Sequence, residues 1–115
     1  MMEKFYAVSN KSSEITTKEY STSFSSAIRL LHHDMQQPIY NIYGFVRFAD
    51  EIVDTFHDYD KTSLLAEFKN DTYSAIHRGI SLNPILNSFQ QTVNEYNIDH
   101  ELVDAFFQSM EMDLS

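Results

Sequence analysis

The scarcity of glycine and proline limits the folds that are open to this chain. Only two glycines and two prolines occur among its 115 residues. A β-sandwich or β-barrel needs a turn about every ten residues, and glycine and proline form most tight turns. Long helices joined by short loops need few of them. The sequence therefore predicts an all-α fold, and the length is that of one domain.

The composition supports a folded core and excludes several classes of function. Apolar residues make up 43% of the chain, including nine phenylalanines and seven tyrosines, which is too apolar for intrinsic disorder. The net charge of −9 argues against nucleic-acid binding, because neutralising phosphates requires clustered Lys and Arg. The absence of cysteine excludes a disulfide, a thiolate zinc site and a cysteine nucleophile.

The chain carries no sequence signal for a membrane. No stretch reaches the roughly 18 apolar residues of a transmembrane helix. The charged residues Glu3 and Lys4 stand near the N-terminus, and no apolar run of a signal peptide follows them. We therefore expect a cytoplasmic protein without a transmembrane segment.

Apolar spacing predicts the first two helices. Residues 1–16 are expected to be a flexible lead-in, because their second half is rich in Ser, Thr, Lys and Glu. A helix should run from about residue 18 to residue 32 or 33, since apolar side chains recur there every three or four positions. These side chains are Tyr20, Phe24, Ala27, Ile28 and Leu31. The next helix should cover residues 35–56, with Asp34 as its N-cap and Pro38 in its first turn.

Three further helices are expected, which makes about five in all. One starts after Asp60 or Thr62 and ends at Gly79. Another has Pro84 in its first turn, and the last is capped by Asp99. The expected buried face of the last helix is Leu102, Val103, Phe106, Met110 and Leu114. Its apolar pattern still runs at the final residue, as it would in the front part of a larger domain.

The helix expected at residues 35–56 combines an apolar surface with one polar stripe. At about 100° per residue, apolar side chains cover most of its circumference. They are Ile42, Phe45, Phe48, Ala49, Ile52, Val53 and Phe56. The polar stripe consists of Tyr43, Arg47, Asp50 and Asp54, each about one turn from the next. Charges on such a helix are costly unless they are paired or bound to a metal.

This stripe has two interpretations. Asp50 and Asp54 offer hard oxygen ligands, which suit an Mg²⁺ ion that takes its other ligands from water and substrate phosphates. Arg47 adds a planar fork for a phosphate. This interpretation predicts a metal-diphosphate site. Alternatively, Arg47 pairs with Asp50 inside a small acidic interaction protein.

The stripe resembles the first aspartate-rich motif of the squalene/phytoene synthase family. In that family an aromatic residue, an arginine and two aspartates follow the spacing of Tyr43-Gly-Phe-Val-Arg47-Phe-Ala-Asp50-Glu-Ile-Val-Asp54. The segment Ser21-Thr-Ser-Phe-Ser-Ser-Ala-Ile28 is similar to the opening serine-rich helix of the family. Two later segments resemble bacterial phytoene synthases of the carotenoid type, namely Asn83-Pro-Ile-Leu86 and Ser109-Met-Glu-Met-Asp-Leu114.

The resemblance implies an all-helical enzyme of isoprenoid synthesis that requires Mg²⁺ or Mn²⁺. Such an enzyme joins two prenyl diphosphates head to head, and the candidate substrates are farnesyl and geranylgeranyl diphosphate. Asp50 and Asp54 would hold the metal ions, and Tyr43 would line the reaction centre. Arg47, Ser21 and Ser23 would contact diphosphate oxygens, whereas Phe24 and Ile28 would line the path of the isoprenoid tail.

Two departures from the family pattern affect these expectations. Tyr20 precedes the serines where some members have histidine. The second aspartate-rich motif of the family lies beyond the end of this chain. We therefore interpret residues 17–115 as the N-terminal portion of a synthase domain that is inactive alone. Its uncovered apolar faces should cause self-association, and the whole protein could associate with a membrane surface when it releases its product.

Overall fold

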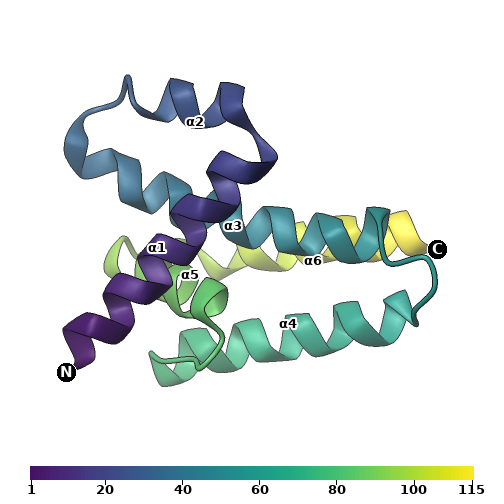
Figure 1. Ribbon diagram of the computed structural model, residues 1–115. Helices are drawn as coiled ribbons and strands as arrows, with labels where there is room; N and C mark the ends of the chain where they lie inside the picture. Colours follow the sequence, from purple (N-terminus) through teal and green to yellow (C-terminus); the bar gives the residue numbers. More distant parts are fainter.

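The computed structural model describes residues 1–115 and contains six α-helices and no β-strand (Figure 1). The all-α prediction is confirmed. The helices are α1 (Met2–Tyr20), α2 (Thr22–Ile28), α3 (His33–Asp54), α4 (Lys61–Arg78), α5 (Pro84–Glu95) and α6 (His100–Leu114). None of them is both long enough and apolar enough to cross a membrane.

The hydrophobic core lies among α3, α4, α5 and α6, and Phe45 of α3 is at its centre. Its ring stacks on Phe89 of α5 with centroids 3.8 Å apart, and on Phe68 of α4 at 5.4 Å. Phe106 and Phe107 of α6 pack against the same ring at 5.3 and 5.7 Å. One buried aromatic residue thus ties three helices to α3.

Local chemistry explains where the later helices begin and end. Asp60 accepts a hydrogen bond from the backbone N–H of Ser63, and Asp99 caps α6 in the same way. Gly79 ends α4 in the left-handed region at φ 73°, which a residue with a Cβ adopts at a cost. Pro84 is the first residue of α5, where its missing N–H is harmless. These predicted boundaries are confirmed.

The prediction of a flexible lead-in over residues 1–16 is wrong, because these residues form most of α1. The buried face of α1 carries small hydroxyl side chains in place of apolar ones. Ser9, Ser13 and Thr17 are completely buried against α3 and α5. Each of these hydroxyls either bonds to a carbonyl one turn back or meets a polar partner across the interface. A search for apolar periodicity overlooks such a helix.

The expected helix over residues 18–33 is also divided differently. It breaks at Ser21, whose extended backbone separates α1 from α2, and α2 ends at Ile28. The cap of α3 is the side chain of His32, which accepts the backbone N–H of Asp34, so Asp34 is not the N-cap. Because α3 starts at His33, Pro38 lies inside the helix and not in its first turn.

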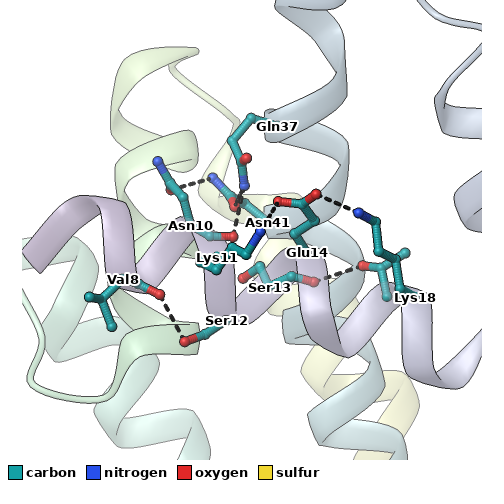
Figure 2. A network of polar contacts seen from close by, with 10 residues as sticks. Val8, Asn10, Lys11, Ser12, Ser13, Glu14, Lys18, Gln37 and Asn41 are labelled. Atoms are coloured by element: carbon teal, nitrogen blue, oxygen red, sulfur yellow. Dashed lines mark hydrogen bonds and ion pairs between the residues drawn. The ribbon is translucent and has the colours of Figure 1, made fainter.

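A polar interface joins α1 to α3 and α5. The hydroxyls of Ser13 and Ser88 are 2.6 Å apart, and the Asn41 amide donates to Thr92 Oγ1 at 3.0 Å. Figure 2 shows the edge of this interface, where the Asn41 amide also reaches Asn10. These buried groups satisfy one another, as buried polar groups must. We call this set the polar interface.

Glycine makes the close approach of α1 to α3 possible. A Cβ placed on Gly44 would lie 3.1 Å from Ser13 Oγ and 3.3 Å from Ser13 Cα. Such a contact is tighter than most Cβ contacts in proteins, so Ser13 would have to shift by a few tenths of an ångström. Gly44 is thus a site where two helix backbones meet, and its role is packing rather than a turn.

The surfaces of α3 and α6 are less buried than their patterns suggested. Phe107 replaces Leu102 in the buried face of α6, since Phe107 is 0% and Leu102 65% exposed. On α3, Phe45, Ala49 and Ile52 are in the core, but Phe48 remains 37% exposed. Ile42 and Val53 are half-buried, and Phe56 is exposed.

Candidate functional site

The polar stripe lies along one face of α3, as the helical spacing predicted. The Arg47 side chain is 22% exposed and the Asp50 side chain 31% exposed. Tyr43 is half-buried, and Asp54, the last residue of α3, is exposed. The stripe therefore runs from a sheltered aromatic end to an open acidic end.

The end of α1 and the start of α2 cover the aromatic end of the stripe. The ring of Phe24 stacks on Tyr43 with centroids 4.9 Å apart and planes at 28°. The guanidinium carbon of Arg47 lies 4.7 Å from the centroid of the Tyr20 ring, a cation–π arrangement. Residues from the serine-rich segment and from α3 thus share one surface.

The remaining predicted contacts have different environments. Ser21 is half-buried, and its hydroxyl oxygen accepts the backbone N–H of Phe24 at 3.1 Å, which caps α2. Its O–H remains able to donate. Ser23 is exposed on α2. Ile28 is 2% exposed, so it packs inside the protein.

Two carboxylates compete for Arg47. Its Nη2 donates a hydrogen bond to Glu51 Oε1, and its Nη1 lies 3.9 Å from Asp50 Oδ2. The hydrogen bond to Glu51 is the main reason that the pKa of Arg47 is raised. The expected pairing of Arg47 with Asp50 is thus the weaker one. The Nε of Arg47 is buried and has no hydrogen-bond partner.

Asp50 is an acid without a hydrogen-bonded partner. Burial raises its pKa above the ordinary value, Arg47 opposes this, and the negative charges of Asp54, Asp113 and Glu51 add to it. Because the pKa of Asp50 is raised in spite of Arg47, the arginine does not compensate fully for burial and the neighbouring negative charges. A cation placed beside Asp50 would do so.

The helix dipole of α3 adds to this excess of negative charge. Glu51 and Asp54 lie in the last turn, where the exposed carbonyls favour cations and disfavour anions by about 0.3–1 kcal/mol each. One cation does approach this end, since Lys61 Nζ donates to the carbonyl of Val53 at 2.6 Å. These acids therefore destabilise the C-terminal end of α3.

Sequence reasoning missed three members of this site. Glu51 stands one turn after Arg47, and this spacing was the available signal. Tyr20 was assigned to an apolar face, but it lies under the guanidinium. Asp113 was not assigned to the site, and only the packing of α6 on α3 brings its charge to Asp50.

The donor set provides part of a metal site. No group of three or more His, Asp or Glu side chains is arranged to hold a metal ion. Asp50 and Asp54 are two hard oxygen donors one turn apart, which fits an Mg²⁺ ion that keeps several waters. Arg47, on the same helix face, carries a planar guanidinium that suits an anionic oxygen. A cavity of about 490 Å³ between α4 and α6 is lined by none of the predicted site residues.

Fold and site together define an all-α protein that presents two aspartates and an arginine on one helix face. The chain belongs to the squalene/phytoene synthase family, whose model matches residues 17–115. It is 30% identical over 95 residues to a presqualene diphosphate synthase of Rhodopseudomonas palustris (strain ATCC BAA-98 / CGA009). That match covers 81% of this chain and 33% of the relative, so the chain spans about a third of the relative's length. No solved structure matches the chain.

Proposed function

We propose that this chain forms the N-terminal part of a synthase that condenses two prenyl diphosphates head to head. The observation that carries the proposal is the convergence of α2 on the polar stripe of α3. Phe24 lies on Tyr43 beside Arg47, and two aspartates follow along the same face. Family membership supports a prenyl-transferring role, and the relative named above is a presqualene diphosphate synthase.

Each side chain has a role that its surroundings support. Asp50 and Asp54 would hold Mg²⁺ or Mn²⁺, and the bound metal would neutralise charge on the departing diphosphate. Arg47 would bind a diphosphate oxygen through its guanidinium. The hydroxyls of Ser21 and Ser23 would donate to the same group.

The aromatic end of the stripe would meet the reacting carbon atoms. The faces of Tyr43 and Phe24 attract positive charge, and their stacked rings keep water away from it. Phe24 would border the isoprenoid tail, whereas the burial of Ile28 suits a role in supporting α2. The donor would be farnesyl or geranylgeranyl diphosphate, in a cytoplasmic protein that contacts a membrane surface during product release.

A binding experiment tests the ligand assignment on the chain itself. An unreactive thio analogue of farnesyl diphosphate is titrated into the protein with Mg²⁺ in a calorimeter. Binding is expected, and Asp50→Asn should weaken it at least about tenfold through loss of a charged ligand. Asp58→Asn is the control, because Asp58 is an exposed acid that follows α3. Equal binding by wild type and Asp50→Asn would contradict the metal-ligand role.

A second experiment tests the reaction. The chain is joined to the C-terminal two thirds of the Rhodopseudomonas relative and incubated with farnesyl diphosphate and Mg²⁺. A head-to-head product is expected from the joined protein, and none from the chain alone. Asp50→Ala should abolish the product. Unchanged turnover by this variant would refute the site assignment.

The pairing of Arg47 with two carboxylates favours one alternative function. In this case the stripe is an internal ion-pair network of a small acidic interaction protein. The network would then exist for stability, and Arg47→Met would destabilise the fold without any effect on ligand binding. The calorimetric titration separates the two functions.

A further inference from the structure

The role of Glu51 follows from the geometry of the acids around Arg47. Glu51 and Asp50 are neighbours in sequence, and both can reach the guanidinium. Arg47 forms its hydrogen bond with Glu51, while its closest approach to Asp50 is 3.9 Å. Glu51 is not one of the motif residues assigned above to metal, substrate or reaction centre.

The ion pair between Arg47 and Glu51 is partly buried, which strengthens its effect on Asp50. The side chains of Arg47 and Glu51 are 22% and 17% exposed, so water screens them less than a pair on the open surface. The guanidinium carbon also lies 4.7 Å from the centroid of the Tyr20 ring. The contact with Tyr20 and the hydrogen bond to Glu51 together restrict the position of the guanidinium.

We propose that Glu51 is a positioning residue that holds Arg47 away from Asp50 and thereby keeps the Asp50 carboxylate free for a divalent cation. Without Glu51, Asp50 becomes the nearest acid to Arg47, one turn away on the same helix face. Arg47 would then form a hydrogen-bonded pair with Asp50 and compete with the metal. The inference concerns the same site and rests on the proposed function for its metal.

The experiment compares Glu51→Gln in two backgrounds. Mn²⁺ is the probe, and free Mn²⁺ is measured by electron paramagnetic resonance at neutral pH. With Arg47 present, Glu51→Gln should weaken Mn²⁺ binding about three- to fivefold, the range of a partly exposed ion pair. In the Arg47→Met background the same substitution should have little effect, because no guanidinium remains to move. Circular dichroism verifies that each variant is folded.

The double comparison separates positioning from simple loss of negative charge. A general charge effect weakens Mn²⁺ binding equally in both backgrounds, and that result would overturn the proposal. Asp58→Asn removes the same charge at an exposed position after α3 and should leave Mn²⁺ affinity almost unchanged.

A second readout needs no metal. The ¹³C resonance of the Asp50 carboxylate is recorded in metal-free protein at neutral pH. It should shift in Glu51→Gln relative to the wild type. It should be the same in Glu51→Gln/Arg47→Met as in Arg47→Met. An unmoved Asp50 signal in Glu51→Gln refutes the positioning role. If the wild type binds no Mn²⁺, or Asp50→Asn binds it equally well, the metal assignment fails. The carboxylate signal still decides the role of Glu51.

Discussion

The Phe24 ring lies on the Tyr43 ring, 4.9 Å from centroid to centroid. This contact joins α2 to the middle of α3. A helix of only seven residues is not stable in isolation, so α2 depends on such contacts and on the burial of Ile28. The cover of the candidate site is therefore held by few side chains.

Phe24→Ala should loosen α2 selectively. The stacked pair contributes about 0.5–1.5 kcal/mol beyond its buried area, so the variant should lose at least about 1 kcal/mol of unfolding free energy. Hydrogen exchange of the α2 amides should accelerate while the core of α3 stays protected. Leu30→Ala is the matched control, since Leu30 is 88% exposed. Equal losses in both variants would mean that the stacking is not stabilising.

Ser21 and Ser23 should respond differently to removal of their hydroxyls. The Ser21 hydroxyl caps α2, and loss of an N-cap costs about 1 kcal/mol. Ser23 is exposed, so Ser23→Ala should change unfolding free energy by less than about 0.5 kcal/mol. Urea unfolding measures both. A Ser23→Ala variant as unstable as Ser21→Ala would contradict the assigned cap.

Gly44→Ala should force α1 away from α3. The new methyl group would lie within 3.1–3.3 Å of Ser13, and relieving this overlap should cost about 1–3 kcal/mol. Combining it with Ser13→Gly removes part of the obstacle. The double variant should therefore be less destabilised than the sum of the two single variants. Simple additivity in thermal or urea unfolding would show that the two helices do not meet at this point.

Tyr73 should make the protein sensitive to alkali. Burial and a hydrogen bond to Asp104 raise the pKa of Tyr73 from 10.0 to about 12. In the unfolded chain this phenol loses its proton at lower pH than in the folded protein, so its contribution to stability is complete below pH 10 and is lost between pH 10 and 12. In Tyr73→Phe, the melting temperature should fall less steeply with pH over this range than it does in the wild type. Tyr59→Phe, at a 70% exposed position, is the control and should keep the wild-type slope.

The chain should self-associate in solution. Large apolar side chains such as Leu30, Leu82 and Leu102 are 88%, 90% and 65% exposed. Exposed apolar surface favours association when several such side chains are available. Light scattering should give a mass that rises with concentration, and polar replacements of Leu30 and Leu102 should reduce the rise. A constant monomer mass over a wide concentration range would contradict this expectation.

The parts of the fold that depend on local chemistry could be predicted from the sequence. Asp60, Gly79 and Asp99 mark helix ends because caps and left-handed stops act within one turn. Helical spacing also predicted that Phe45 faces the core, but it did not predict the exposure of Phe48. In contrast, α1 was missed because its buried face consists of serine and threonine. The repeat of small hydroxyls at Ser9, Ser13 and Thr17 was the signal, and it acquires meaning only opposite Gly44 and α5.

The candidate site could likewise be predicted only where it depends on local helical geometry. The alignment of Tyr43, Arg47, Asp50 and Asp54 requires only that the segment is helical. The choice of Glu51 over Asp50 by Arg47 depends on side-chain conformation, which spacing leaves open. The approach of Asp113 depends on how α6 packs on α3, and no pattern within either helix contains this information.

The polar interface of α1 also determines the longitudinal alignment of that helix. The short side chains of Ser13 and Ser88 reach each other only when they stand opposite, so their contact at 2.6 Å favours one register of α1. Tyr20 follows Ser13 by seven residues, about two helical turns. One inserted residue between them would rotate the Tyr20 ring by about 100° and withdraw it from Arg47, with both side chains unchanged. The position of the Tyr20 ring beside Arg47 thus depends on the register that the contact between Ser13 and Ser88 gives to α1.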